Sequence, residues 1–262
     1  MKVLAVETAT SWQSVAILDD SRVLARQDQD AAGSHARLLL PTIDRLFREA
    51  GLTLNQLDGL VVSIGPGSFT GLRVGLATLL GFRTISRLPL ALVPTLESMA
   101  WNFKGTSTLL CPVLNSRREE LYWALFRWAS DDVLERVMSE QVGTAAMLGK
   151  SLTGSVLVFG EGWTVEAPAI RASIHSSTNI IEAPDLAMKP SAVSIGLAGV
   201  ARLKRGECAG IGIGPLYVQR TAAELKYEES GGLPPATLRQ KRVMRKASAR
   251  KVATRNPPTR IP

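Results

Sequence analysis

The 262-residue chain is long enough to bury one large or two modest cores, and its 45% hydrophobic content is that of a globular protein. No stretch reaches the roughly 18 uncharged apolar residues of a membrane helix, and the apolar run before Glu7 is too short for a signal peptide. Only two cysteines are present, Cys111 and Cys208, so a disulfide framework is not expected. These features predict a soluble, cytoplasmic protein without a membrane segment.

The net charge of +8 belongs to one end of the chain. Residues 230–262 contain nine Lys and Arg and no Asp or Glu, which leaves 22 basic and 23 acidic residues elsewhere. This segment is rich in Gly, Pro and Ala, and it is therefore predicted to be a disordered basic tail. Its cations would attract RNA phosphates, but it has no aromatic side chain to stack on bases. Non-specific RNA contact and a merely solubilising role both stay open.

The first part of the chain alternates apolar runs and helical patterns in the order β-β-β-α-β-α-β. Strands are expected at residues 3–7, 14–18, 23–27, 59–64, 90–93, 109–114, 121–126, 156–159 and 216–219. Helices are expected at 35–50, from the end of a 65–71 loop to about 87, at 96–103 and at 191–205. Ser34 is a plausible N-cap of the first helix, and Gly51 stops it. This order is typical of an RNase-H-like or actin-like half domain. The predicted domains are residues 1–104, residues 105–229 and the tail, with the helix at 191–205 able to pack back on the first domain.

A glycine-rich loop at residues 65–71, between a strand and a helix, is the strongest local feature. Gly65, Gly67 and Gly71 allow a tight turn and a close approach of the backbone. A helix N-terminus attracts anions, but this glycine spacing is neither a dinucleotide fingerprint nor a P-loop, and no lysine is present to meet a phosphate. A phosphate cradle and a structural turn capped by Ser68 or Thr70 are both compatible with the sequence.

The helix that follows the loop carries two opposed apolar stripes. One consists of Leu72, Leu76 and Leu79, and the other of Val74, Ala77, Gly81 and Ile85. A surface helix normally needs one such stripe, so this helix is predicted to be covered on both sides. The second cover is either another part of this chain or another subunit.

Signals for catalysis are weak. His35 and His175 are the only histidines, and no His or Cys cluster has the spacing of a metal site. Glu119 and Glu120 are neighbours in an extended segment, so their side chains point to opposite faces and cannot act as a paired acid and base. Glu7, at the end of the first strand, could hold Mg²⁺ through water, or it is a solvated strand end. An actin-like small-molecule kinase or ATPase that uses Glu7 and the 65–71 loop is therefore the alternative function.

Several phrases together resemble the bacterial TsaB (YeaZ) family over about residues 1–227. They are residues 4–10 (Leu-Ala-Val-Glu-Thr-Ala-Thr), His35 with Leu39, Leu40 and Pro41, residues 65–73 (Gly-Pro-Gly-Ser-Phe-Thr-Gly-Leu-Arg), residues 93–100, Arg117 with residues 120–124, residues 160–163 and residues 215–220. The nine-residue glycine phrase is far more specific than a generic glycine loop.

The resemblance implies an actin-like (ASKHA) α/β fold of two subdomains and a role in tRNA modification. TsaB proteins are non-catalytic partners of TsaD, which transfers a threonylcarbamoyl group to an adenosine next to the tRNA anticodon. The partners implied are therefore a TsaD-like transferase and a TsaE-like ATPase, with tRNA bound indirectly and a homodimer as an option for the isolated chain. No catalytic residue, no metal and no tightly bound cofactor are implied; ADP or ATP is expected only at the interface with partners.

The resemblance also implies which residues serve these roles. The partner interface is predicted to comprise Leu72, Arg73, Leu76, Leu79, Leu80, Arg83, Leu39 and Ile43. A degenerate phosphate loop is predicted to comprise Glu7, Gly65, Gly67, Ser68, Thr70 and Gly71. The chain departs from the family pattern at two places. Glu7 stands where Asp is usual, which further weakens tight binding of a metal and nucleotide, and Asn115-Ser116 replaces the usual Asp-Ala before Arg117. The tail has no counterpart in the family.

Overall fold

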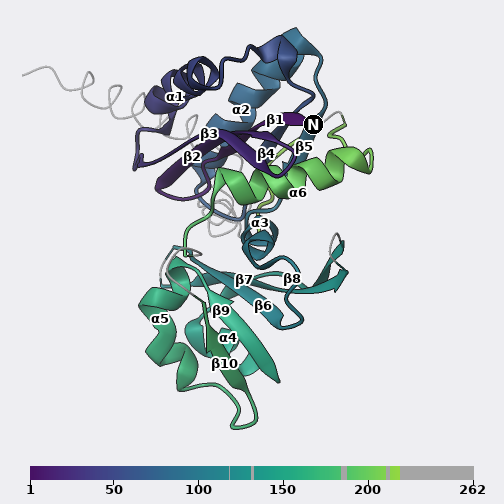
Figure 1. The fold of residues 1–262 in the computed structure, drawn as a ribbon. Coiled ribbons are helices and arrows are strands. Elements are labelled where there is room, and N and C mark those ends of the chain that lie inside the picture. Colours follow the sequence, from purple (N-terminus) through teal and green to yellow (C-terminus); the bar gives the residue numbers. More distant parts are fainter. Residues whose placement is uncertain (118, 131–132, 184–187, 211–212, 219–262) are drawn as a thin grey trace, which may run out of the picture. The chain divides into compact units, whose positions relative to one another are not determined.

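A computed structural model of the chain describes residues 1–117, 119–130, 133–183, 188–210 and 213–218 (Figure 1). Its strands form two five-stranded sheets. The tail predicted at residues 230–262, and the RNA contact considered for it, lie outside the described residues.

The first sheet contains an antiparallel meander and two parallel strands. The meander is β1 (Lys2–Glu7), β2 (Trp12–Asp19) and β3 (Arg22–Asp30), and β4 (Gly59–Ser63) and β5 (Leu90–Val93) run parallel to β1. The spatial order is β3-β2-β1-β4-β5. Every residue of β4 is buried, as expected for a central parallel strand.

Helices cover both faces of this sheet, and the alternation along β1 shows how. Leu4 and Val6 belong to a core formed with α1 (His35–Ala50) and α2 (Phe69–Ser86). Val3 and Ala5 point to the opposite face, into a core shared with α6 (Ala192–Lys204). The first sheet therefore lies between α1 and α2 on one side and α6 on the other (Figure 1).

Glycines bring α6 unusually close to the first sheet. A Cβ atom at Gly196 would lie 2.5 Å from a methyl carbon of Leu18, and one at Gly199 would lie 2.2 Å from a methyl carbon of Val61. Side chains at these two positions would push the helix away from the strands. The helix that follows the second sheet in sequence is thus built to pack on the first sheet.

The second sheet has the spatial order β10-β9-β6-β7-β8. Its strands are β6 (Leu109–Asn115), β7 (Leu121–Ser130), β8 (Val133–Gly143), β9 (Ser155–Phe159) and β10 (Asn179–Glu182), and its helices are α4 (Ala145–Ser151) and α5 (Glu161–Arg171). The strands β6, β7 and β8 form an antiparallel meander, while β9 and β10 are parallel to β6. This is the topology of the first sheet repeated, although the sequence shows no internal repeat. Two such halves make the actin-like fold, and the predicted fold class is confirmed.

Helix α3 (Thr95–Ala100) and the short 3-10 helix η2 (Trp101–Phe103) connect the two sheets. The mostly buried carboxylate of Glu97, on α3, accepts three hydrogen bonds from the Arg202 guanidinium of α6, at 2.7, 2.8 and 3.3 Å. It accepts a fourth from Arg136 of β8 at 3.1 Å. One carboxylate therefore joins elements from both halves of the described chain.

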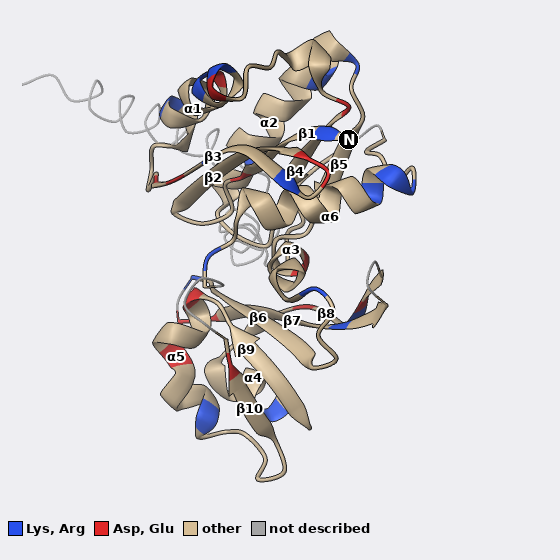
Figure 2. Cartoon of the chain, in the orientation of Figure 1, with Lys and Arg blue, Asp and Glu red and all other residues tan. Residues whose placement is uncertain are grey.

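The structure also corrects the expected elements. Residues 216–218 form no strand; they are attached instead by a hydrogen bond from Leu216 N–H to the Ile64 carbonyl oxygen (2.7 Å), and residue 219 lies outside the described part. Strands β8 and β10 and helices α4 and α5 were not expected. No helix among the described residues is long and apolar enough to span a bilayer. Acidic and basic residues are interspersed over the described part (Figure 2), as expected for a body close to neutral.

Candidate functional site

The glycine loop between β4 and α2 rests directly on the end of β1. Gly65 and Gly67 have φ values of 107° and 157°, and a Cβ atom at Gly67 would lie 2.2 Å from the Ala9 carbonyl oxygen. A Cβ atom at Gly71 would lie 2.1 Å from the Thr8 carbonyl oxygen. Glycine is therefore required at these positions by the neighbouring backbone of this chain.

Two backbone donors of the loop are bound within the protein. The N–H of Ser68 donates to the Ala9 carbonyl oxygen (2.6 Å), and the N–H of Gly71 donates to the Ser68 hydroxyl (3.2 Å). Ser68 is thus the N-cap of α2, as the structural alternative required, and Thr70 is exposed without a capping role. This arrangement favours a structural turn over a phosphate cradle.

Glu7 is fully buried at the base of the loop. One carboxylate oxygen accepts hydrogen bonds from the Ala9 N–H (2.5 Å) and the Ser63 hydroxyl (3.0 Å), while the other has no partner. Burial raises the pKa of Glu7 to about 7, against the lowering effect of these hydrogen bonds. The interpretation as a solvated strand end is therefore wrong. Through these hydrogen bonds the carboxyl instead stabilises the turn that follows β1 and links it to the end of β4.

His35 plays a similar structural part. It is buried at the start of α1, and its Nε2 lies 2.9 Å from the Thr10 carbonyl oxygen. A carbonyl only accepts, so Nε2 carries the proton in this contact. The expected helix-start position is correct, but the side chain tethers α1 to the loop after β1.

A polar pocket of about 380 Å³ opens beside the loop. It is lined by Ala9, Thr10, Ser11, Gly67, Ser68, Leu114, Asn115, Ser116, Arg117, Tyr122 and Glu161. Of the six residues predicted for a degenerate phosphate loop, Gly67 and Ser68 line it and Glu7 does not. Burial raises the pKa of Glu161, an effect that the nearby Lys189 opposes. Among the described residues, no group of three His, Cys, Asp or Glu side chains could hold a metal ion.

The structure separates the two apolar stripes of α2. Leu72, Leu76 and Leu79 are at most 5% exposed and pack into the core beneath the helix. In contrast, Ile85 is 74% exposed, and Ala77 and Gly81 are also exposed. One stripe is thus covered by this chain. In the other stripe, Ala77, Gly81 and Ile85 are exposed, whereas Val74 is half-buried and packs against the same core.

Most of the predicted interface residues therefore need correction. Five of them are buried and offer no surface to a partner. Leu39, Ile43, Leu76 and Leu79 belong to the core between the two helices and the first sheet, and Leu72 is 1% exposed. Their side chains point from α1 and α2 into the core of the first half of the chain, so a partner cannot contact them.

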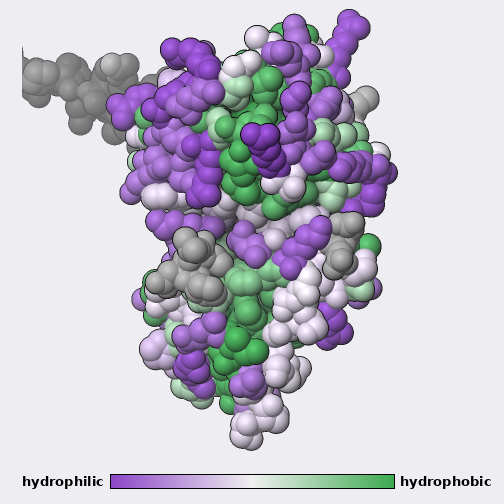
Figure 3. All heavy atoms as spheres, in the orientation of Figure 1, coloured by the Kyte–Doolittle hydropathy of each residue, from purple (hydrophilic) through white to green (hydrophobic). Residues whose placement is uncertain are grey.

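The other three lie closer to the surface. Leu80 and Arg83 are half-buried, and Arg73 is exposed. The accessible apolar residues of the two helices are instead Leu40 on α1 and Ile85, Ala77 and Gly81 on α2. In Figure 3, hydrophobic atoms reach the surface beside α1, over the region of α2.

An aromatic and arginine cluster sits at the start of α2. The rings of Phe69 and Tyr217 stack with centroids 5.4 Å apart, and the Arg73 guanidinium lies 3.9 Å from the Phe69 centroid. Arg73 Nε donates to the Tyr217 hydroxyl (2.9 Å). Tyr217 is 43% exposed and was not assigned a role from the sequence, although it lies in the family-like segment 215–220.

Comparison with known proteins connects this arrangement to a family. The family model described as "TsaD: tRNA N6-adenosine threonylcarbamoyltransferase" matches residues 24–227. The protein called "tRNA threonylcarbamoyladenosine biosynthesis protein TsaB" of Escherichia coli (strain K12) is 30% identical over 172 residues, which cover 62% of this chain and 72% of the relative. The protein of the same name in Bacillus subtilis (strain 168) is 26% identical over 235 residues, which cover 88% of this chain and 99% of the relative.

A solved structure shares the fold. The structure described as "YeaZ from Pseudomonas aeruginosa" matches with a TM-score of 0.68 and 22% sequence identity, covering 82% of this chain and 99% of that one. The chain therefore belongs to the family of that matching model and, within it, to the TsaB (YeaZ) proteins of tRNA threonylcarbamoyladenosine biosynthesis.

Proposed function

We propose that this chain is a non-catalytic partner of a TsaD-like threonylcarbamoyltransferase and that it docks through the outer face of α2. This outer face is defined by Arg73, Val74, Ala77, Gly81 and Ile85. The observation that carries the proposal is the second apolar stripe of α2, in which Ala77, Gly81 and Ile85 stay exposed while the first stripe is packed. An exposed apolar stripe on an otherwise well-packed helix is typical of a protein interface.

The shape of the outer face suits a helix as its counterpart. Ala77 and Gly81 are one turn apart, and a Cβ atom at Gly81 would meet no atom within 4 Å. Small residues at this spacing leave a shallow groove in which ridges of a second helix can lie. The Phe69, Arg73 and Tyr217 cluster borders this groove with residue types that dominate binding energy at interfaces.

The non-catalytic part of the proposal rests on the glycine loop. Two of its backbone donors are bound by the Ala9 carbonyl and the Ser68 hydroxyl, and Glu7 is fully buried and does not line the polar pocket. Nothing in this geometry favours the alternative kinase or ATPase function. We propose that ADP or ATP would bind only where a partner completes the polar pocket.

The remaining partners follow from the same proposal. A TsaE-like ATPase would act on the pair formed with the transferase, and tRNA would be bound indirectly through the complex in the cytoplasm. When the transferase is absent, the outer face of α2 could pair with its own copy in a homodimer, since a symmetric contact buries the same apolar stripe twice.

The test is co-purification with the TsaD-like protein of the same genome. Ile85→Asp places a carboxylate on the outer face, and we expect the affinity for the transferase to fall roughly tenfold or more. Val165→Asp is the matched control. Val165 is 62% exposed and lies on α5, which belongs to the second half of the chain and not to the outer face of α2. Circular dichroism should show both variants folded.

The outcome that would overturn the proposal is equal binding of the Ile85 and Val165 variants. A homodimer that persists in Ile85→Asp, measured by analytical ultracentrifugation, would separately contradict the shared use of this face.

A further inference from the structure

The outer face of α2 lies in a part of the chain that has cations and no carboxylates. Residues 59–96 contain Arg73, Arg83 and Arg87 and no Asp or Glu, although the chain outside the tail has nearly equal numbers of acidic and basic residues. Residues 208–218, which are hydrogen-bonded to α2, contain no charged residue at all. On α2 in Figure 2 the coloured positions are basic. The surface of this helix is therefore positively charged.

The partners of these arginines within the chain are neutral. Arg73 Nε donates to the Tyr217 hydroxyl (2.9 Å), and Arg83 donates to the Gly210 carbonyl oxygen (3.4 Å). Arg87 is exposed. Among the described residues, no carboxylate lies within ion-pair distance of any of the three. Their contacts thus orient two of the guanidinium groups and leave all three charges uncompensated.

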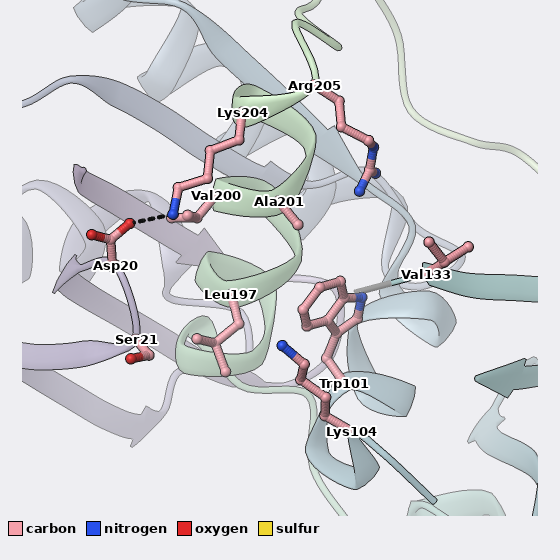
Figure 4. Close-up of a pocket in the computed structure, with 10 residues that line it drawn as sticks. All are labelled: Asp20, Ser21, Trp101, Lys104, Val133, Leu197, Val200, Ala201, Lys204 and Arg205. Atoms are coloured by element: carbon pink, nitrogen blue, oxygen red, sulfur yellow. Dashed lines mark ion pairs between the residues drawn. The ribbon is translucent and has the colours of Figure 1, made fainter. Parts of the chain in front are cut away.

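Cations on other helices are compensated within the chain. At the end of α6, Lys204 lines a pocket of about 420 Å³ and extends toward Asp20, with which it pairs at 2.7 Å (Figure 4). Arg205 pairs with Glu207 at 2.6 Å. Two arginines of α1 pair with acidic residues one turn away in the same helix. On α2, in contrast, uncompensated positive charge coincides with an exposed apolar stripe.

The charges flank the small residues of the outer face. At about 100° per residue, Arg73, Ala77 and Thr84 lie within about 40° of one another, and Gly81 adjoins them. Arg87 caps the C-terminal end of the helix. From Arg73 to Arg87 the helix rises about 21 Å at 1.5 Å per residue. A small, apolar centre therefore has one cation near each end.

The helix dipole does not cancel these charges. The N-terminus, near Arg73, is the positive end and adds roughly half a charge of the same sign. The C-terminus is the negative end, with roughly half a negative charge, but Arg83 and Arg87 bring two positive charges to it. These two arginines stabilise α2 and still leave an excess of positive charge. Anionic groups are thus favoured at both ends of the outer face.

We propose that the outer face of α2 binds an acidic amphipathic helix of the transferase. Carboxylates about four turns apart on that helix pair with Arg73 and Arg87, and its apolar side chains cover Ala77 and Gly81. A small crossing angle of about 20° keeps two helices in contact over this length. RNA is a poorer match, because the centre of the surface is apolar and offers it no cation. The inference rests on the proposed function and adds the charge of the partner's surface.

The same charges distinguish the partner from a second copy of this chain. When two α2 helices pair by two-fold symmetry, arginines meet arginines and find no carboxylate. Salt screens attraction between the chain and an acidic partner, and it screens repulsion between two copies. Added salt should therefore weaken binding to the transferase and strengthen self-association through this face.

The test measures the affinity of the full chain for the TsaD-like protein of the same genome by calorimetry at about 50 and about 300 mM NaCl. We expect the dissociation constant of the natural chain to rise roughly three- to tenfold with salt. Arg73→Gln and Arg87→Gln should each weaken binding at low salt roughly two- to fivefold, and the double variant should lose most of the salt dependence. Arg73→Lys keeps the charge, so it should keep the salt dependence even though the contact with Tyr217 changes.

The matched control is Arg127→Gln, which removes the same charge from an exposed position on β7 in the second half of the chain. It should bind as the natural chain does at both salt concentrations. The basic tail is present in every variant, so the comparison between variants isolates the contribution of α2. Circular dichroism checks that each variant is folded.

Three results would overturn the inference. They are an affinity that salt leaves unchanged or raises, a double variant with the salt dependence of the natural chain, and tighter binding by Arg87→Glu. If Ile85→Asp abolishes binding while one of these results is found, the docking face stands and only the charge of the partner is wrong. Salt-sensitive tRNA binding by the isolated chain that disappears in the double variant would assign the arginines to RNA, and it would equally overturn the inference.

Discussion

The N–H of Ser68 donates a 2.6 Å hydrogen bond to the carbonyl oxygen of Ala9, and this contact closes the glycine loop against the end of β1. A phosphate group at a helix N-terminus depends on free N–H donors. Here the N–H of Ser68 is bound to Ala9, and the N–H of Gly71 is bound to the capping hydroxyl of Ser68. The loop is therefore a structural element that positions α2.

The first prediction is that the isolated chain does not bind ATP with Mg²⁺ at submillimolar affinity. The reason is that a nucleotide would have to displace the Ser68–Ala9 hydrogen bond and gain no lysine contact in return. Isothermal calorimetry measures this directly. Submillimolar binding accompanied by turnover would instead support the small-molecule kinase or ATPase function.

Two glycines of α2 should respond to alanine in opposite directions. A Cβ atom at Gly75 would lie 2.4 Å from the Thr8 hydroxyl oxygen, so Gly75→Ala should destabilise the fold by about 1–3 kcal/mol through overpacking. A Cβ atom at Gly81 meets open space, so Gly81→Ala should stabilise the helix by about 0.5–1 kcal/mol. Urea unfolding of both variants gives the two signs. Equal effects would mean that α2 does not pack on β1 as described.

The sequence predicts the first sheet well because its strands and helices are marked by strong local signals. The helix at 35–50 ends at Gly51, which adopts a left-handed conformation with φ of 63°, and β5 has the expected bounds. The second sheet is less visible. Strand β8 mixes apolar and polar residues on both of its sides and buries only Gly143, and α5 contains Pro168. Neither pattern has the hydrophobic period of its element.

The candidate site was predictable only in part. The sequence shows that α2 has two apolar stripes, but it cannot say which stripe the sheet takes, because both are compatible with a buried face. Gly71 and Gly75 carry a usable signal, since they lie where α2 approaches Thr8 most closely. The stacking of Tyr217 on Phe69 could not be predicted from the sequence, because 148 positions separate the two residues and no local pattern joins them.

The burial of one stripe leads to a prediction about stability. Leu76 is 5% exposed, so Leu76→Ala should cost about 2–5 kcal/mol of unfolding free energy by leaving a cavity beneath α2. Ile85 is 74% exposed, so Ile85→Ala should change stability by no more than about 0.5 kcal/mol. Denaturant titrations of the two variants check this difference. Similar losses in both would show that Ile85 is covered, and the outer face would then not be available to a partner.

The buried carboxyl of Glu7 predicts how stability depends on pH. Its pKa is raised from 4.5 to about 7 in the folded protein because burial disfavours the charged form. Between these two values the unfolded chain has released the proton and the folded chain retains it. The free energy of unfolding therefore falls as pH rises from 4.5 to about 7, by a total on the order of 3 kcal/mol from this group.

Glu7→Gln should remove this slope, because the amide does not titrate. The comparison is between the pH dependences of the natural chain and the variant, measured by urea unfolding over that range. Glu7→Gln itself changes hydrogen bonds to Ala9 and Ser63, so its stability at one pH is not informative, whereas the difference in slope is. Asp58→Asn is the matched control, since Asp58 is exposed and accepts a hydrogen bond from the Lys2 N–H. Parallel curves for the natural chain and Glu7→Gln would mean that Glu7 is ionised in the folded protein and that water or a cation reaches its unpartnered oxygen.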